Sequence, residues 1–399
     1  MSEAPATTPS VGFMNRLHAS LTAQVLLIAL VTRFLLFLVS WIGLRIFDRL
    51  PYYPGQVPDS FLPDAAWIDG WARWDTAHYV AIAFFGYGAE ESPSHNGGLG
   101  FFPIYPMLMR GVAWFAPGPI TEGQLAAAAV LISNVAFLIA VPMFASIVAR
   151  RATIDIARTA TLLLCISPFS YFFMAGYSES LFLLMVAASF WFADRDQWWA
   201  AAIASALATA TRLVGLALPP ALLLLAWRKR RSIRDLVTIC LIAPIGIVIW
   251  FAITWYRFND FFAYFTAQEN WGGWKEHVWF YLRLFLTDPR EALFGDPRHL
   301  VIVLNVALAA LWLATLPWVW RRLDPGIALL TTLLIVLQGT MTWVSLGRYL
   351  LPAIGAFIAF AWLLERPAWR GWPRDLVIVT CALTVSFLTV LFSHGFWSI

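Results

Sequence analysis

The stretch LTAQVLLIALVTRFLLFLVSWIGL, residues 21–44, decides the fold class because it is long, apolar and continuous. A helix needs about 20 mostly apolar residues to cross the hydrocarbon core of a bilayer. Similar runs fill the rest of the 399-residue chain, which is 60% hydrophobic and 13% charged. Soluble domains carry roughly 25% charge. We therefore predict an all-α integral membrane protein, since continuous runs suit helices and do not show the alternation of barrel strands.

The apolar runs predict one polytopic domain over residues 21–399, with about 9–11 membrane segments. Residues 1–20 are predicted to be a disordered cytoplasmic N-terminus. The run at 21–44 is too long for a signal-peptide core, so we interpret it as a retained span. The candidate spans are 21–44, 101–116, 123–149, 157–174, 178–193, 198–226, 234–256, 299–320, 326–345, 349–364 and 375–394.

Charge predicts which ends of the spans face the cytoplasm, because short cytoplasmic loops are enriched in Lys and Arg. Segment 48–100 carries seven acids against two arginines, and segment 257–298 is long, so we predict both to be external loops. The predicted cytoplasmic loops hold the basic clusters Arg150-Arg151, Arg228 to Arg231, Arg321-Arg322 and Arg366 to Arg374.

With this orientation, two parts of the chain each contain one apolar segment more than the number of membrane crossings that the charge pattern requires. We assign the surplus to 101–116, which contains Pro103 and Pro106, and to 198–226, which is interrupted near Arg212. Broken helices at membrane depth occur where they are buried in protein or line a cavity. Both breaks therefore point toward a site.

The stretch RWDTAHYVAIAFFGYG, residues 73–88, places Asp75 among aromatic residues at the edge of the first external loop. A helix over 66–82 would lie in the membrane interface with Asp69 and Arg73 paired toward solvent and Asp75 unpaired at the outer boundary. An amphipathic anchor with a merely solvated Asp75 is the alternative. One face of the predicted helix would carry Trp67, Trp71, Trp74 and His78.

Other charged residues lie at the ends of apolar runs or inside them. Arg33 is predicted to be a structural hydrogen-bond donor, whereas Arg212 suits a structural or a functional role. Glu179, in YSES, and Arg348, in SLGRYLLP, fall at predicted external ends. Arg348 can clamp a phosphate oxygen or extend to the lipid interface.

The stretch FFAYFTAQENWGGWKEH, residues 261–277, has the amides and indoles of a sugar-binding surface, in which Gln268, Asn270 and Trp271 would contact substrate. Ordinary interfacial anchoring is the alternative. The sequence has no HExxH, P-loop or GxSxG motif, which argues against a metalloprotease, an ATPase or a serine hydrolase. No cofactor is predicted, although a divalent metal remains open, and the three cysteines are expected to be buried hydrophobes.

Six stretches together resemble the PIG-V family of mannosyltransferases. In order they are RWDTAHYVAIAFFGYG, FFPIYPMLMR, SPFSYFFMAGYSESLFLL, ATRLVGLALPPALLL, FFAYFTAQENWGG and SLGRYLLP. The resemblance runs from about residue 20 to 365, and the Trp- and Arg-rich composition is typical of a bacterial member, for which a GPI precursor would be an unexpected acceptor. It implies a GT-C helical bundle in the plasma membrane, an external active site and a polyprenyl-phosphate-linked sugar donor.

The resemblance also implies roles for individual residues. The catalytic acid of the family maps onto Asp75, the YSES carboxylate onto Glu179 and the arginine of the RY motif onto Arg348. Their neighbours in these motifs are predicted to bind substrate, namely Arg73, His78, Tyr79, Tyr177 and Tyr349, together with Arg212.

The chemistry of inverting transfer agrees with these roles. A carboxylate takes the proton of the acceptor hydroxyl while an oxocarbenium-like transition state forms, and cations stabilise the leaving phosphate. Asp75 would be the base, with Arg348 and Arg212 at the phosphate. The predicted partners are a polyprenyl-phosphate mannose donor, a lipid-linked or cell-envelope acceptor and the bilayer. The alternatives are transfer of another sugar, a lipid-linked glycan ligase and, in another class, a lipid-linked sugar flippase.

Overall fold

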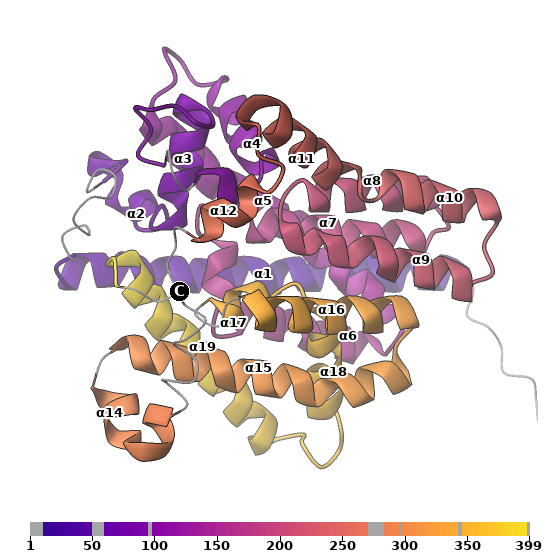
Figure 1. The fold of residues 1–399 in the computed structure, drawn as a ribbon. Helices are drawn as coiled ribbons and strands as arrows, with labels where there is room; N and C mark the ends of the chain where they lie inside the picture. The colour runs from indigo at the N-terminus through magenta and orange to yellow at the C-terminus, as the bar shows by residue number, and fades with distance from the viewer. Residues whose placement is uncertain are drawn as a thin grey trace, which may run out of the picture.

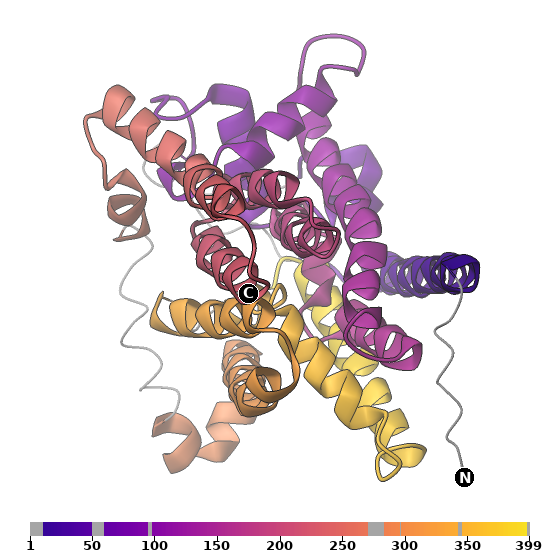
Figure 2. The same cartoon turned by 90° about the vertical axis from the view of Figure 1, so that its right-hand side faces the viewer.

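The computed structural model describes residues 11–49, 60–94, 98–269, 283–295, 297–341 and 345–396. All regular elements in these ranges are helices, most of which run side by side in one bundle (Figure 1). Figure 2 views many of these helices nearly along their axes, with α1 (Val11–Ile46) at the edge of the bundle. The all-α membrane fold predicted from the apolar runs is confirmed.

Helix α1 begins at Val11, inside the segment 1–20 that the sequence predicts to be disordered. The remaining elements include short helices and 3-10 turns as well as the longer helices of the bundle. They are η1 (Pro63–Ala65), α2 (Ala66–Asp69), α3 (Asp75–Phe85), η2 (Gly98–Gly100), α4 (Ile104–Ala113), α5 (Glu122–Ala149), α6 (Ile154–Ile166), η3 (Ser170–Phe173), α7 (Glu179–Ala193), α8 (Trp198–Thr209), η4 (Leu213–Ala217), α9 (Leu218–Arg228), α10 (Ile233–Ile242), α11 (Ile245–Phe258), α12 (Ala263–Glu269), α14 (Pro289–Phe294), α15 (Pro297–Arg322), α16 (Pro325–Met341), α17 (Leu346–Tyr349), α18 (Ile354–Leu364) and α19 (Trp372–Ser393).

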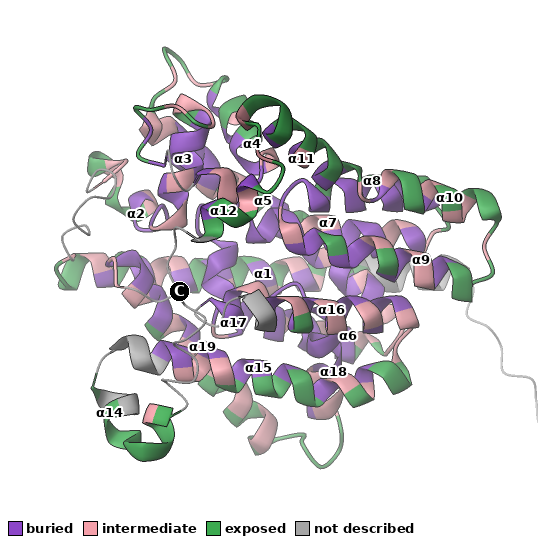
Figure 3. Ribbon diagram, viewed as in Figure 1, coloured by how far each residue is buried: buried purple, intermediate pink, exposed green. Residues whose placement is uncertain are grey.

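Several of these helices are suited to a bilayer by length and composition. Within the described ranges, five segments have the length and apolarity to cross it: Ser20–Ile46, Glu122–Ala149, Ile233–Phe258, Val301–Arg322 and Trp372–Ser393. Shorter apolar helices, α7, α8, α9, α16 and α18, pack between them. Buried residues concentrate in α3, α5, α7 and α8, and α14 is exposed (Figure 3).

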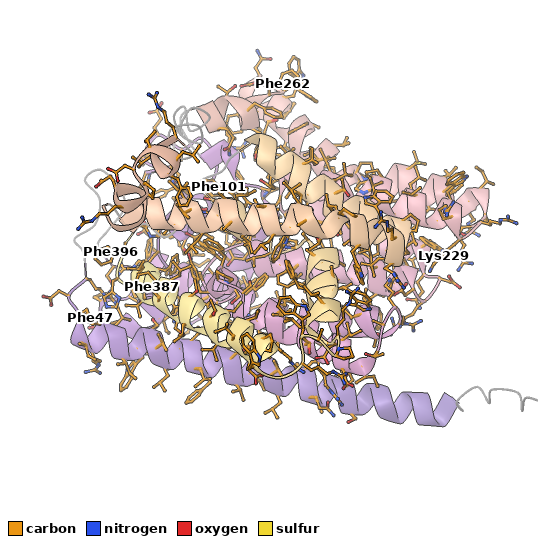
Figure 4. All side chains as sticks on the ribbon, turned by 90° about the horizontal axis from the view of Figure 1, so that it is seen from below. Phe47, Phe101, Lys229, Phe262, Phe387 and Phe396 are labelled. Atoms are coloured by element: carbon orange, nitrogen blue, oxygen red, sulfur yellow. The ribbon has the colours of Figure 1, made fainter. Side chains whose placement is uncertain are left out.

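One end of the bundle gathers basic residues from several turns, and we call it the basic end. Arg151 forms salt bridges with Asp194, at 2.6 Å, and with Asp324, and Lys229 lies 3.7 Å from Asp194. Figure 4 shows Lys229 at this end and Phe47 at the opposite end. The predicted cytoplasmic clusters at 150–151 and 228–231 therefore lie at one end of the bundle.

The predicted segment 198–226 is broken, as expected, and forms a hairpin of two short helices. α8 starts next to the turn of Asp194 at the basic end, and the chain reaches Arg212, which pairs with Glu179 at the far end of α7. η4 and α9 then return to Lys229 at the basic end. Because the hairpin begins and ends on the same side, the count of spans no longer conflicts with the charge pattern.

The predicted segment 101–116 also does not cross the bundle. Helix α4 has 10 residues, so it is roughly 15 Å long, about half the thickness of a hydrocarbon core. It packs against α3 and α5 at the end opposite the basic end (Figure 1). Pro103 stands at its N-cap and Pro106 in its first turn, where proline is tolerated.

The prediction of one helix over 66–82 is wrong. α2 ends at Asp69, and α3 starts only at Asp75, after Trp74 adopts a positive φ of 52°. The interruption has a partner in the loop before α7, because the amide of Gly176 donates to the carbonyl of Trp71 at 2.9 Å. The tryptophans therefore do not form one interfacial face, and Trp71 is buried in the main core.

The predicted pair of Asp69 and Arg73 exists but does not face solvent. Their side chains lie 3.3 Å apart and both are buried. Asp69 also binds Arg49 at 2.9 Å and accepts the backbone amides of Phe61 and Leu62. Asp69 therefore links residues 49, 61, 62 and 73 through one carboxylate. Burial of this carboxylate is tolerated because arginines and N–H donors surround it.

Substitution of Gly246 by Ala tests the packing of α11 against α8. A Cβ atom at this position would lie 2.1 Å from the carbonyl oxygen of Ala206, so the helices must separate. We expect a loss of about 1–3 kcal/mol and a melting temperature lower by several degrees, measured by the intrinsic fluorescence of the detergent-purified protein.

Gly111→Ala is the matched control, because nothing lies within 4 Å of the added methyl group. It should leave the melting temperature unchanged or raise it, since Ala favours a helix over Gly by about 1 kcal/mol. Equal effects of the two substitutions would contradict the close approach of α8 and α11.

Candidate active site

Four chain segments that are far apart in sequence bring two acids and two arginines together. Asp75 opens α3, Glu179 opens α7, Arg212 stands at the break between α8 and η4, and Arg348 lies in α17. Three residues with predicted site roles, Asp75, Glu179 and Arg348, are in contact here. We call these four residues the charge cluster.

Arg348 is the centre of the charge cluster. Its Nη1 donates to Oδ2 of Asp75 at 2.7 Å, and its Nε lies 3.2 Å from Oε1 of Glu179. Its Nη2 donates to the Tyr349 hydroxyl at 2.6 Å, and Tyr177 lies under the guanidinium at 5.2 Å. Asp75 is therefore not the unpaired acid that the sequence predicts, because the chain folds the RY motif back onto it.

Glu179 links the two arginines. Arg212 Nη1 donates to its Oε1 at 2.7 Å and lies 3.2 Å from the Ser178 hydroxyl. Glu179 Oε2 is buried and has no hydrogen-bond partner among the described residues. An acceptor oxygen of this kind is available to a substrate hydroxyl, since a buried carboxylate is stabilised by each additional donor.

Local structure explains the positions of both acids. Each stands in the first turn of a helix, where unpaired backbone N–H groups and the helix dipole stabilise a carboxylate. Trp74 before Asp75 has φ 52° and ψ −116°, a sparsely populated conformation. The Tyr177 hydroxyl accepts the backbone amide of Asp75 at 3.1 Å, which orients the start of α3.

Close approach of the two loops depends on a glycine. The Thr76 hydroxyl donates to the carbonyl of Gly176 at 3.1 Å. A Cβ atom on Gly176 would lie 2.9 Å from Thr76 Cγ2 and 3.1 Å from Ala129 Cβ. Only a residue without a side chain lets the AGYSES loop approach the start of α3 this closely.

The charge cluster is largely buried, with Asp75 and Arg212 half-buried, and it is formally neutral because two carboxylates offset two guanidiniums. Glu179 is 1% exposed, Arg348 4% exposed, and the Asp75 side chain 16% exposed. Burial by itself would lower the pKa of Arg348, but Tyr349, Asp75 and Glu179 outweigh burial and keep this pKa well above its usual value. Burial also raises the pKa of the Tyr177 hydroxyl well above its usual value.

Tyr79 and His78 surround the cluster from α3. The Tyr79 hydroxyl is 2.8 Å from the Ser178 hydroxyl, so it borders the residue that Arg212 contacts. His78 Nδ1 lies 2.7 Å from the Ser94 hydroxyl, and its ring stacks on Phe101 at 5.0 Å. Burial lowers the pKa of His78 below 6.5, more than the nearby Asp75 raises it.

Some predicted substrate-binding residues lie elsewhere or cannot be placed. Arg73 is engaged with Asp69 at the start of the loop, and Gln268 is exposed next to Gly100 in η2. Asn270 and Trp271 lie outside the described residues. Arg33 is structural, as predicted, because it donates to Asn134 and to the carbonyl of Phe173.

Sequence reasoning missed Tyr264 as the contribution of α12 to the site. Burial and then Tyr349 raise the pKa of its hydroxyl, while Arg212 lowers this pKa, so the hydroxyl interacts electrostatically with two residues of the site. The ring packs on Phe102 at 5.5 Å. The motif FFAYFTAQEN was identified in the sequence, but its amides and indoles drew the prediction to Gln268, Asn270 and Trp271 instead of Tyr264.

The arrangement can bind an anion and abstract a proton. Two guanidiniums contact two carboxylates, and the rings of Tyr177 and Tyr349 pack on these guanidiniums. Asp75 and Glu179 are the acids available to a divalent cation here, but arginine holds both. Within the described ranges, no group of three His, Cys, Asp or Glu side chains has the proximity of a metal site.

Comparison with known proteins shows which family part of the chain resembles. Residues 53–225 match the family model described as Mannosyltransferase (PIG-V). The match covers less than half of the chain, and this segment is therefore similar to the PIG-V mannosyltransferases. It contains Asp75, Glu179 and Arg212, whereas Arg348 lies beyond the matched residues.

Curated proteins similar to part of this chain carry the name GPI alpha-1,6-mannosyltransferase 2. The mouse protein is 34% identical over 160 residues, and the match covers 37% of this chain and 30% of the mouse protein. The human protein is 31% identical over 157 residues, with the same coverage. The chain thus spans less than a third of the length of the curated relatives it matches.

Solved structures extend the comparison over almost the whole chain. ArnT from Cupriavidus metallidurans, bound to undecaprenyl phosphate, has a TM-score of 0.50 at 15% identity and covers 92% of this chain and 74% of ArnT. The apo oligosaccharyltransferase of Archaeoglobus fulgidus has a TM-score of 0.51 at 13% identity, and the match covers 96% of this chain and 56% of the oligosaccharyltransferase chain. Both are GT-C membrane glycosyltransferases, and the chain shares their fold.

Removal of one charge from the cluster should destabilise the protein more than removal of a pair. Glu179→Gln leaves the buried guanidinium of Arg212 without its carboxylate, and breaking a buried pair costs about 3–5 kcal/mol. The double variant Glu179→Gln, Arg212→Gln should recover part of this loss, as measured by thermal unfolding in a double-mutant cycle.

The exposed pair of Asp155 and Arg158 is the control for this cycle. Its side chains are 60% and 41% exposed, and its coupling should be below about 1 kcal/mol. A coupling between Glu179 and Arg212 that is no larger would refute the buried pair.

Stability should fall on acidification because of His78. Its pKa is lowered on folding, so the unfolded state takes up a proton near pH 6.5 that the folded state does not yet bind. The contribution of His78 to the free energy of unfolding is present above pH 6.5 and is lost as the pH falls below it. Melting temperatures measured from about pH 7 to 5 should decrease less steeply in His78→Gln than in the unsubstituted protein. Parallel curves would contradict the buried neutral imidazole.

Proposed function

We propose that this protein is an inverting mannosyltransferase that takes mannose from a polyprenyl-phosphate donor and transfers it to a hydroxyl of a lipid-linked or cell-envelope acceptor. The observation that carries the proposal is the contact of Arg348 with both Asp75 and Glu179. This contact brings together the groups that such a transfer needs, a carboxylate for the acceptor proton and cations for the leaving phosphate, in one neutral cluster.

Asp75 is the general base of the proposed reaction. It is the more exposed acid of the cluster, with a side chain 16% exposed, and it stands where the first loop meets the bundle. The carboxylate takes the proton of the acceptor hydroxyl as the acceptor oxygen attacks C1 of mannose. The bond from C1 to the phosphate oxygen breaks on the opposite face, which inverts the anomeric carbon.

Arg348 and Arg212 stabilise the departing polyprenyl phosphate. A phosphate monoester leaves as an anion and therefore needs positive charge rather than a proton donor. Each guanidinium already has a carboxylate partner, at 2.7 Å in both cases, so phosphate binding exchanges one anion for another. Exchange loosens Arg348 from Asp75 and leaves the base free to accept a proton.

Glu179 orients the sugar. Its Oε1 holds both arginines, whereas its buried Oε2 has no partner among the described residues. A hydroxyl of mannose or of the acceptor can donate to this oxygen. Tyr79, Tyr177, Tyr264 and Tyr349 add hydroxyl groups and ring faces around the same space, as sugar sites commonly require.

The proposed location is the external face of the plasma membrane. The charge cluster lies at the end of α7 away from the turn of Asp194, and Arg151 and Lys229 gather at that turn. Short basic loops favour the cytoplasmic side, so the charge cluster would face outward. A flippase is not favoured, because the described carboxylates of the cluster gather at one end and not along a path through the bundle.

Asp75→Asn is the decisive test of the proposed base. The amide cannot accept the proton, so release of polyprenyl phosphate from labelled polyprenyl-phosphate mannose should fall about a thousandfold or more. This product is measured because its formation does not require the acceptor to be known. Purified protein in detergent with membrane extract as the source of acceptor is sufficient.

Asp64→Asn is the matched control, an exposed acid of the same loop, and it should keep full activity. A native melting profile for Asp75→Asn would separate lost chemistry from lost folding. Turnover of that variant near the level of the control would refute the assignment.

A further inference from the structure

A second polar feature lies at the other end of α3. A groove of about 370 Å³ is formed by the C-terminal turn of α3, by α4 and by the last turn of α11. Its walls are mostly apolar and include Phe84, Phe85 and Met107. Met107 is 66% exposed and Tyr256, next to the groove residue Arg257, is 89% exposed, as expected of residues that contact lipid.

Two guanidiniums, Arg110 and Arg257, line this apolar groove, and no acid is among its described lining residues. Arg110 Nη1 donates to the carbonyl of Ala83 at 2.7 Å, which fixes the side chain over the unpaired end of α3. Nη1 also lies 3.4 Å from the carbonyl of Phe84, and the part of the chain that the structure describes gives the Nε and Nη2 groups no hydrogen-bond acceptor. Both arginines are exposed, and the groove therefore has the charge and the walls of a site for an anion with an apolar tail.

The position of the groove relative to Asp75 separates it from the donor phosphate. Asp75 is the first and Phe85 the last residue of the 11-residue helix α3, so they are roughly 15 Å apart along its axis. The donor phosphate is bonded to the reacting carbon and must lie beside Asp75. An anion at Arg110 and Arg257 is too distant for that role and instead suits the lipid end of the acceptor.

We propose that the groove of Arg110 and Arg257 binds the phosphate headgroup of the lipid-linked acceptor, while the glycan of the acceptor extends along α3 to Asp75. This inference rests on the proposed transferase function and deepens it. It requires an acceptor that has a lipid-borne phosphate and a glycan of more than one sugar between this phosphate and the reacting hydroxyl. A neutral glycolipid or a free sugar would not use the groove.

Binding of a lipid phosphate tests the groove without any transfer. The probe is fluorescent dioctanoyl phosphatidic acid, and its binding to the 399-residue protein in neutral detergent is followed by anisotropy. Arg110→Gln with Arg257→Gln should weaken binding about tenfold or more, because charge-assisted hydrogen bonds are lost. Arg45→Gln is the matched control, an exposed arginine in the last turn of α1, and should leave affinity unchanged.

Competition defines the ligand. Unlabelled dioctanoyl phosphatidic acid should displace the probe, whereas inorganic phosphate and dioctanoyl glycerol should not, since the site needs charge and tail together. Displacement by inorganic phosphate at similar concentration would overturn the assignment to a lipid. An equal loss of affinity in Arg45→Gln would show general attraction of anionic lipid to interfacial arginines and would also overturn it.

Transfer kinetics connect the groove with the acceptor. In the double variant, the apparent KM for membrane-extract acceptor should rise about tenfold, with the KM for polyprenyl-phosphate mannose and the melting temperature unchanged. A raised donor KM would overturn the acceptor assignment. If the unsubstituted protein does not transfer mannose, the proposed function fails. The binding experiment still decides whether the groove is a lipid-phosphate site.

Discussion

The ion pair of Arg348 with Asp75 and Glu179 is the constraint on which the arrangement of the bundle depends. It connects residues 273 positions apart in sequence, and each partner comes from a different helix terminus. A guanidinium 4% exposed is retained only where carboxylates and hydroxyls surround it. The starts of α3, α7 and α17 must therefore meet, and the helices behind them follow.

A neutral buried cluster is a compromise between stability and chemistry. Two carboxylates and two guanidiniums offset one another, but an apolar core of equal volume would often be as stable or more stable. The cluster also keeps an acceptor oxygen of Glu179 without a partner and Trp74 in a sparsely populated conformation. Such costs are typical of functional sites, because the same unsatisfied groups bind the substrate.

The two ends of α3 give this short helix a double role in the proposed reaction. Its N-terminal turn holds Asp75 against Arg348, and its C-terminal carbonyls hold Arg110 at the apolar groove. A helix is a rigid spacer, so the distance between base and groove does not depend on loops. In the proposed reaction, the segment that contains α3 can therefore set both the chemistry and the length of the acceptor that reaches Asp75.

The sequence by itself determined the membrane class, the broken segment at Arg212 and the identity of the charged residues that meet. Apolar runs and ionisable residues inside them are costly in a bilayer and carry that information locally. Tertiary structure alone decided that Asp75 is paired, that Asp69 and Arg73 are buried, and that α3 starts at residue 75. Residues 66–82 have a helical pattern, but hydrogen bonds to the distant Gly176 loop interrupt it, and local periodicity cannot register a partner about 100 residues away.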